Sequence, residues 1–426
     1  MKIFLKYLKI FALLNVSFFI FSVLSCMMPT EWYKKNIKES LPELLEEGNY
    51  PKTILKGKQY QQDNFTDVLV LNISISSDSK KPVWSALMNP YSFDTHDKGS
   101  WNSVKSLEHK SKNWDISPNV LYGRYWHGNA SFCRFLLPLM NYQDIKLFLY
   151  MISTILLLIF LIKIINRAGW IKSFPLFLAL LFANLFVTQF SIQFFPVMAI
   201  SLICGILICN KRFFSQKKAS LLMFVTGCFT AFFDLLTTPL LTLGIPLIVY
   251  MVLFGETKKT LLELFKFIFI LSLLWFMGYA CTWATKWALV CIFANSESLD
   301  VINTIIWRTG TKDYTRWEVI VANFLLLPYI LMGIILAFLL LLSVLCFNKK
   351  RIIQAISFLI IGLLPYIWYF VLSNHSYQHW WFTYRAQVIS MASAMLFFVS
   401  LIDWERLMSI FKIKNSKSSH LGVNKL

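Results

Sequence analysis

Apolar runs of about 20 residues alternate with short polar stretches along most of the chain. The first run ends near Met28, a long polar stretch follows from Pro29 to about Asp144, and apolar runs then recur as far as Ile402. The pattern predicts an all-α polytopic membrane protein with about ten transmembrane helices. The first helix is a signal anchor within residues 1–28, and nine more form a bundle over residues 145–402, near Ile145–Ile165, Ser173–Phe190, Phe195–Cys209, Ala219–Leu235, Leu240–Phe254, Leu264–Trp283, Val319–Cys346, Ile352–Leu372 and Gln387–Ile402.

Basic residues mark alternate connections between these runs. The positive-inside rule places such connections in the cytoplasm. It therefore predicts that both termini are cytoplasmic, that residues 29–144 form an extracytoplasmic domain, and that residues 403–426 form a basic cytoplasmic tail. The basic segments are the N-terminal Lys2, Lys6 and Lys9, then Lys163–Lys172, Lys211–Lys218, Glu256–Lys259, Lys349–Arg351 and the tail.

Composition supports the same conclusion. Of the 426 residues, 57% are hydrophobic, only 15% are charged, and Phe alone contributes 39. A net charge of +19 would suit a nucleic-acid partner. The charge is confined to short clusters between apolar runs, however, so a nucleic-acid partner is excluded and membrane lipid is expected instead. The abundance of Phe, Ile, Lys and Asn is typical of a bacterial plasma membrane protein.

The polar stretch after the first helix is expected to be a mixed α/β domain. Asp67–Ser74 (DVLVLNIS) is rich in apolar and β-branched residues and predicts a strand. Glu31–Glu47 has helical spacing of its apolar residues. Asp94, His96 and Asp97 in FDTHD resemble metal ligands, but without a second cluster of known spacing no metal site is predicted. The cofactor stays unassigned, with a divalent cation as the one candidate.

Histidines, arginines and aromatic residues gather in three segments on the expected outer side. They are Tyr122–Gly128 (YGRYWHG), Gly278–Trp287 (GYACTWATKW) and Asn374–Arg385 (NHSYQHWWFTYR). Charged groups at membrane depth usually face a cavity or a partner, so one interpretation is a polar site. The other is an interfacial aromatic belt with snorkelling cations. The candidate phosphate- or substrate-binding residues are Arg124, His127, Lys286, Arg308, His375, His379 and Arg385.

Asp234 stands in FDLLTTPLLTLGIPL, where the neighbouring positions are almost wholly apolar. An aspartate at the edge of a membrane helix needs a partner and is a functional candidate. Alternatively, Asp234 and Thr237 cap the next helix ahead of Pro239. We hypothesise that Asp234 and His375 lie in one outer cavity.

The order of one helix, a large outer loop and many helices with short connections resembles the GT-C superfamily, as do the acidic and basic residues gathered outside. Those proteins are multi-pass glycosyltransferases that use polyprenyl-phosphate-linked sugars on the outer membrane face. The three outer segments also look like those of uncharacterised bacterial multi-pass membrane proteins. The resemblance implies a catalytic acid in the first outer loop, where Glu31 occupies the usual location. Its paired acidic signature is absent, so Asp234, Glu31 and Asp67 all remain candidates for the base. The resemblance further implies that Lys286, Arg124, Arg308 or Arg385 holds the lipid phosphate.

Two other functions stay open. A flippase or transporter for a lipid-linked saccharide would place ionisable residues near helix centres and show two related halves. The chain has no clear internal repeat and almost no such residues, which counts against ion-coupled transport. A non-catalytic membrane protein would tolerate replacement of Asp234 and of the outer histidines.

Overall fold

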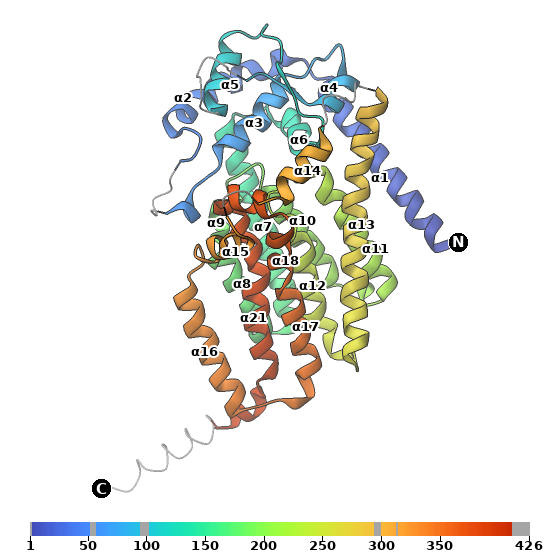
Figure 1. The fold of residues 1–426 in the computed structure, drawn as a ribbon, viewed down its shortest axis with the longest axis vertical. Coiled ribbons are helices and arrows are strands. Elements are labelled where there is room, and N and C mark those ends of the chain that lie inside the picture. The colour runs from blue at the N-terminus through green and yellow to red at the C-terminus, as the bar shows by residue number, and fades with distance from the viewer. Residues whose placement is uncertain (1, 52–56, 94–101, 294–299, 312–313, 411–426) are drawn as a thin grey trace.

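The computed structural model describes residues 2–51, 57–93, 102–293, 300–311 and 314–410. Two layers are visible in Figure 1: a cap of short helices and, below it, a bundle of long helices. The cap is formed by residues 29–141, and the bundle contains α1 (Lys2–Cys26) and every helix from α7 onward. Helices long and apolar enough to cross a membrane make this an integral multi-pass membrane protein.

The cap is helical in its described residues, so the prediction of a mixed α/β domain is wrong there. Its sheet is a single antiparallel pair, Pro90–Tyr91 (β1) with Val120–Leu121 (β2). The expected helix around Glu31–Glu47 is confirmed. The helical elements are η1 (Thr30–Tyr33), α2 (Lys34–Glu47), η2 (Lys58–Tyr60), α3 (Asn64–Ile75), α4 (Pro82–Met88), α5 (Ser103–Lys112) and α6 (Gly128–Leu136).

The predicted strand Asp67–Ser74 is part of α3. Asp63 caps this helix by accepting the backbone N–H of Thr66 at 3.0 Å. Helix α3 is buried on nearly all sides, between α5 and α6 among others. Its continuous apolar run therefore reflects burial all round, and tertiary packing overrides the strand preference of its β-branched residues.

The bundle begins with α7 and ends with α21. Its helices are α7 (Tyr142–Ala168), α8 (Trp170–Phe182), α9 (Leu185–Gln189), α10 (Phe195–Ile208), α11 (Gln216–Phe233), α12 (Leu241–Phe254), α13 (Leu261–Phe293), α14 (Val301–Thr309), α15 (Arg316–Phe324), α16 (Tyr329–Leu345), α17 (Ile352–Gly362), α18 (Leu364–Val371), α19 (Ser373–Gln378), α20 (Trp380–Thr383) and α21 (Val388–Leu401). Short 3₁₀ turns lie at Lys211–Phe213, Gly255–Thr257, Lys349–Arg351 and Tyr384–Gln387.

Fewer helices have the length of a membrane span than the ten expected. Among the described residues five stretches qualify, and a sixth does if α15 and α16, bent by 82°, form one span. The other predicted spans fall on helices that are shorter or less apolar. Asn184 (φ 57°) and Leu236 (φ 65°) have left-handed backbones that interrupt two of the apolar runs. The five stretches are Lys2–Cys26, Tyr142–Ala168, Leu261–Phe293, Lys349–Val371 and Trp380–Leu401.

Two buried cations join the cap to long helices. Arg134 on α6 donates to the Ser25 hydroxyl on α1 (3.2 Å) and to the carbonyls of Ile73 (3.0 Å) and Ser74 (3.3 Å) at the end of α3. The Lys286 Nζ on α13 donates to the Ala86 carbonyl on α4 at 2.8 Å. Both cations thus meet the carbonyl-rich ends of cap helices, where positive charge is favourable.

Candidate functional site at the junction of cap and bundle

Three segments that are distant in sequence meet beneath the cap. The Tyr125 ring lies 5.3 Å from the Trp283 ring on α13, measured between centroids. The Arg308 guanidinium on α14 lies 5.4 Å from the centre of the Tyr125 ring. A cavity of about 30 Å³ is enclosed here by Arg124, Tyr125, Trp283, Trp287, Val301, Thr304, Ile305 and Arg308. Two predicted phosphate-binding residues, Arg124 and Arg308, therefore line the same small cavity.

Asp234 follows the last residue of α11 and is buried. Its carboxylate accepts the backbone N–H groups of Leu236 (2.7 Å) and Thr237 (3.0 Å) and so closes the turn after α11. It does not cap the next helix, because the N-cap of α12 is Leu240 and receives no side-chain hydrogen bond. Burial raises the pKa of Asp234 to about 7, while these N–H groups and the nearby Arg308 act in the lowering direction. The carboxyl group therefore titrates near neutral pH and lies within the electrostatic reach of Arg308.

His375 contacts the same turn. Its Nε2–H donates to the Leu236 carbonyl at 2.8 Å, one residue from the atoms that Asp234 holds. Asp234 and His375 thus contact one turn, whereas the hypothesis was that they share one outer cavity. The lining of the small cavity at Arg308 includes neither side chain.

The histidines of this region are neutral near pH 7. Burial lowers the pKa of His127 and His375 well below the usual value, and neighbouring cationic groups act in the same direction. Burial and Arg308 lower the pKa of His379 to about 4. Each therefore acts as a neutral imidazole with one donor and one acceptor rather than as an additional cation.

Several buried polar atoms of this region have no hydrogen-bond partner among the described residues. Such atoms cost free energy and call for a water or a ligand. They come from the loop before α6, from α13, from α14 and from α19–α20, so they surround the Tyr125–Trp283–Arg308 contact and the Asp234 turn. They are Arg124 Nε, Tyr279 Oη, Trp283 Nε1, Arg308 Nε, His375 Nδ1 and His379 Nδ1.

Asp67 belongs to a second group, in which both of its carboxylate oxygens are hydrogen-bonded. Its two oxygens accept the N–H groups of Ile192 (2.9 Å) and Gln193 (3.0 Å) and the hydroxyls of Ser191 and Tyr142 (3.1 Å each). Burial raises its pKa to about 6, against the lowering by these donors. Asp67 therefore fixes the turn between α9 and α10 to the cap.

Arg385 lies in this second group as well. It is buried, donates to the carbonyls of Gln59 (3.2 Å) and Trp381 (3.4 Å), and lies 4.8 Å from the centre of the Phe194 ring. Gln193 links the two groups, because its Nε2 donates to Asp63 at 2.8 Å and its Oε1 accepts the Thr237 hydroxyl at 3.4 Å.

Two further candidate residues lie apart from the cavity. The Lys286 ammonium donates to the Ala86 carbonyl and lies 5.5 Å from the centre of the Trp126 ring. Its charge therefore stabilises the attachment of the cap to α13. The Glu31 side chain is 71% exposed and pairs with Lys34 at 2.5 Å. Within the described residues no group of three or more potential metal ligands occurs. Asp94, His96 and Asp97 lie outside the described residues.

Comparisons with protein-family models, with curated proteins and with solved structures find no match to this chain.

The geometry adds residues to the candidate site that the sequence did not single out. Tyr279 and Trp283 stack one helical turn apart on α13 (5.6 Å), and Lys286 lies on the next turn. Polar atoms repeating at this spacing in an otherwise apolar helix are a signal that the sequence did carry. Gln193 and Arg134 carried no comparable signal, since their partners are distant in the chain.

Proposed function

We propose that this protein is a membrane glycosyltransferase that takes sugar from a polyprenyl-phosphate-linked donor on the outer face of the bacterial plasma membrane. The product would be a cell-envelope polysaccharide or glycolipid. One observation carries the proposal: two arginines line a cavity, and a buried carboxyl group that titrates near neutral pH lies within reach of one of them. Polar atoms without a partner among the described residues lie on the segments around this arrangement, and a polar ligand would supply their hydrogen bonds.

Arg124 and Arg308 would hold the donor phosphate. Arginine presents a planar fork of donors that matches phosphate oxygens, and both residues have an unpartnered buried Nε. As the bond between the sugar C1 and the phosphate oxygen breaks, negative charge grows on the phosphate. Preorganised cations stabilise that charge in the transition state.

Asp234 would act as general base. It would accept the proton of the acceptor hydroxyl as the hydroxyl oxygen bonds to C1, and polyprenyl phosphate would leave with the electron pair of the broken bond. A pKa near 7 suits this role, because the carboxylate is then both populated and basic near neutral pH. Neutral His375 and His379, with unpartnered Nδ1 atoms, would orient sugar hydroxyls.

Donor binding requires an opening of the cavity. A volume of about 30 Å³ accommodates about one water molecule and no sugar. Helix α14 supplies Val301, Thr304, Ile305 and Arg308 to the wall, while Ile302 (74% exposed) and Ile306 (61%) face away from the protein. The proposal therefore requires α14 to move away from α13 when the donor enters.

We base the proposed orientation in the membrane on the basic segments, which the positive-inside rule places in the cytoplasm. The proposal includes ten crossing segments, with α8, α10, α11 and α12 as short or broken spans enclosed by the longer ones, both termini inside and the cap outside. The candidate site then faces the outer leaflet, where a polyprenyl-phosphate sugar presents its head group.

The test is turnover of a panel of polyprenyl-phosphate sugars by protein in lipid nanodiscs. We expect donor cleavage by the wild type, a loss of about 10²- to 10⁴-fold in Asp234→Asn, and unchanged cleavage in Glu46→Gln, which removes an exposed cap carboxylate. Equal cleavage by wild type and Asp234→Asn would eliminate Asp234 as base. Donor binding without cleavage would replace the transferase by a carrier of lipid-linked saccharides, and absence of both would refute the proposal.

A further inference from the structure

Helix α1 is packed more closely at its C-terminal end than at its N-terminal end, where Tyr7 and Phe11 contact Phe224 on α11 at 5.1 and 6.3 Å between ring centroids. Its C-terminal half has buried positions at Phe18, Ser22, Ser25 and Cys26, where it meets α4 and α6 of the cap. The first half is largely exposed and diverges from the rest of the bundle toward the N-terminus (Figure 1). Beside these contacts, the side chains of α1, α11 and α13 leave a gap between the three helices.

Side chains line this gap as a groove of about 1010 Å³ between α1, α11 and α13. That volume is at the upper end of the range of about 300–1,000 Å³ for small-molecule sites. Most of its wall is aliphatic or aromatic, from Ile3, Phe4, Tyr7, Leu8, Phe11, Leu221, Phe224, Leu274, Met277 and Cys281. In a membrane such a wall suits hydrocarbon chains.

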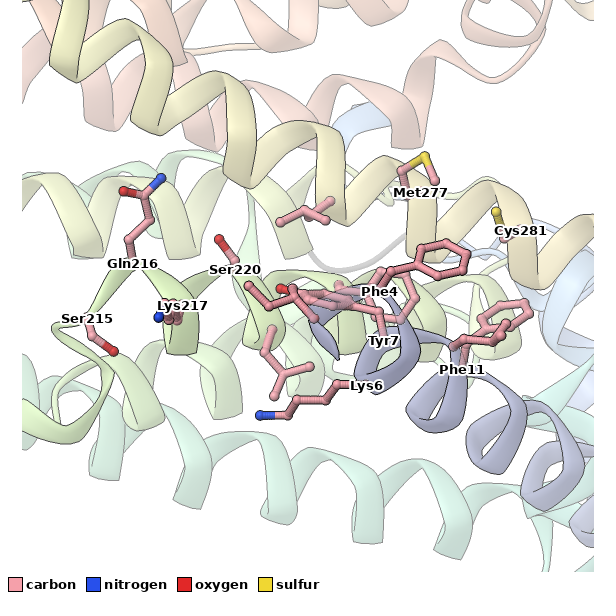
Figure 2. A pocket seen from close by; sticks show the side chains of 15 residues that line it. Phe4, Lys6, Tyr7, Phe11, Ser215, Gln216, Lys217, Ser220, Met277 and Cys281 are labelled. Carbon is pink, nitrogen blue, oxygen red and sulfur yellow. The ribbon is translucent and has the colours of Figure 1, made fainter. Parts of the chain in front are cut away.

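One end of the groove is polar and cationic. Figure 2 shows Ser215, Gln216 and Lys217 at one end and Phe11 and Cys281 at the other, with Lys6 between them and its ammonium group directed toward the polar end. The first turn of α11 lies at this end, and Ser215 makes no side-chain capping bond to it. Uncapped N–H groups and two lysines both favour an anion here. No aspartate or glutamate is among the residues lining the groove, so neither lysine meets a counter-charge within it.

We propose that this groove binds one anionic phospholipid. Its phosphate lies against Lys6 and Lys217, and its acyl chains run along Phe4, Phe11 and Met277 toward Cys281. The lipid fills the groove and adds to the contacts that the N-terminal half of α1 makes with α11 and α13. A soluble anion would leave the apolar wall uncovered, and a zwitterionic lipid would leave the two lysines without net compensation. This binding site is independent of the transferase chemistry proposed above.

The experiment is native mass spectrometry of the full-length protein released from nanodiscs that contain equal amounts of phosphatidylglycerol and phosphatidylcholine. We expect one phosphatidylglycerol molecule to be retained in preference to phosphatidylcholine. In Lys6→Gln/Lys217→Gln that retention should fall by about tenfold or more, because each lysine near an anionic headgroup contributes measurably to binding. Leu221→Trp, which keeps the charges and fills the groove, should also release the lipid.

The matched control is Lys9→Gln/Lys218→Gln. It removes one lysine from α1 and one from α11, like the test variant, but neither residue lines the groove. We expect this control to retain the lipid as the wild type does. Equal loss in both double variants would show diffuse surface attraction and overturn the proposal. Retention of both lipids alike by the wild type, or retention unaffected by the Lys6/Lys217 and Leu221 changes, would overturn it as well.

Discussion

Asp67 and Asp234 are both buried aspartates at the junction of cap and bundle, yet their surroundings differ. Asp67 accepts four hydrogen bonds, two from backbone N–H groups and two from hydroxyls. Asp234 accepts hydrogen bonds from backbone N–H groups of its own turn and from no hydroxyl among the described residues, and it lies near Arg308, in a region with unpartnered polar atoms. Both carboxylates are therefore buried, and the hydrogen-bond donors around them distinguish one from the other.

This difference separates a structural carboxylate from a candidate for chemistry. A carboxylate whose lone pairs are all matched stabilises one conformation and has little capacity for a ligand. A carboxylate beside unsatisfied donors is surrounded by groups that a ligand would complete. We therefore assign Asp67 to the architecture and keep Asp234 as the proposed base.

The largest effect that sharpens the comparison is expected at Arg308. Arg308→Gln should lower the rate of donor cleavage by about 10²- to 10³-fold, because it removes a cation from the growing phosphate charge. Arg308→Lys should restore part of the rate, since the charge returns without the planar fork. The measurement is steady-state turnover in nanodiscs, with Arg212→Gln in the exposed 3₁₀ turn before α11 as control. A wild-type rate in Arg308→Gln would remove Arg308 from the site.

Acid should also reduce turnover through Asp234. The pKa of this carboxyl group is raised to about 7, so the basic carboxylate dominates above that pH and the inactive acid below it. Below about pH 7 the rate should fall by about tenfold per pH unit, as expected for titration of one group. A pH–rate profile that is flat between pH 5 and 8 would contradict the assignment of Asp234 as base.

Asp67→Asn should instead affect stability. Replacing the carboxylate leaves some of its four donors unmatched, so we expect a loss of about 2–3 kcal/mol in the free energy of unfolding. In the folded protein the pKa of Asp67 is raised to about 6, above its unfolded value. The stability that this raised pKa contributes is fully present below the unfolded pKa and is lost as pH rises through about 6. Thermal unfolding followed from pH 4 to 7 should therefore show a flatter profile in Asp67→Asn. An identical profile and midpoint in the variant would refute the architectural role.

The smallest effect is expected at Glu31, the position at which the GT-C resemblance would locate a catalytic acid. Its exposed pairing with Lys34 contributes little. Glu31→Gln should change the unfolding free energy by less than about 0.5 kcal/mol and leave donor cleavage intact. A large loss of cleavage would return the catalytic acid to the first outer loop.

The apolar pattern was sufficient to predict a helical membrane bundle, because each long run is helical, either as one helix or as two in succession. It could not separate full spans from short helices, since left-handed residues such as Asn184 and Leu236 are not visible in hydropathy. It also mistook α3 for a strand, because a helix buried on all sides shows no helical periodicity.

Part of the candidate site was predictable as well. Charge alternation assigned Arg124, Asp234, Arg308 and His375 to one side of the membrane, and the structure brings them to one junction. The partner of Lys286 was not predictable, because the Ala86 carbonyl lies 200 positions away in the chain. The same holds for Asp67, whose donors come from residues 142 and 191–193.

The most direct test compares Asp234→Asn with Asp67→Asn in one assay of polyprenyl-phosphate sugar cleavage, expressed per folded protein, with the unfolding midpoint of each. We predict that Asp234→Asn loses cleavage and keeps a midpoint near that of the wild type, while Asp67→Asn keeps cleavage and unfolds at a lower temperature. The reverse pattern, with cleavage lost in folded Asp67→Asn and kept in Asp234→Asn, would contradict the assignment of the two carboxylates.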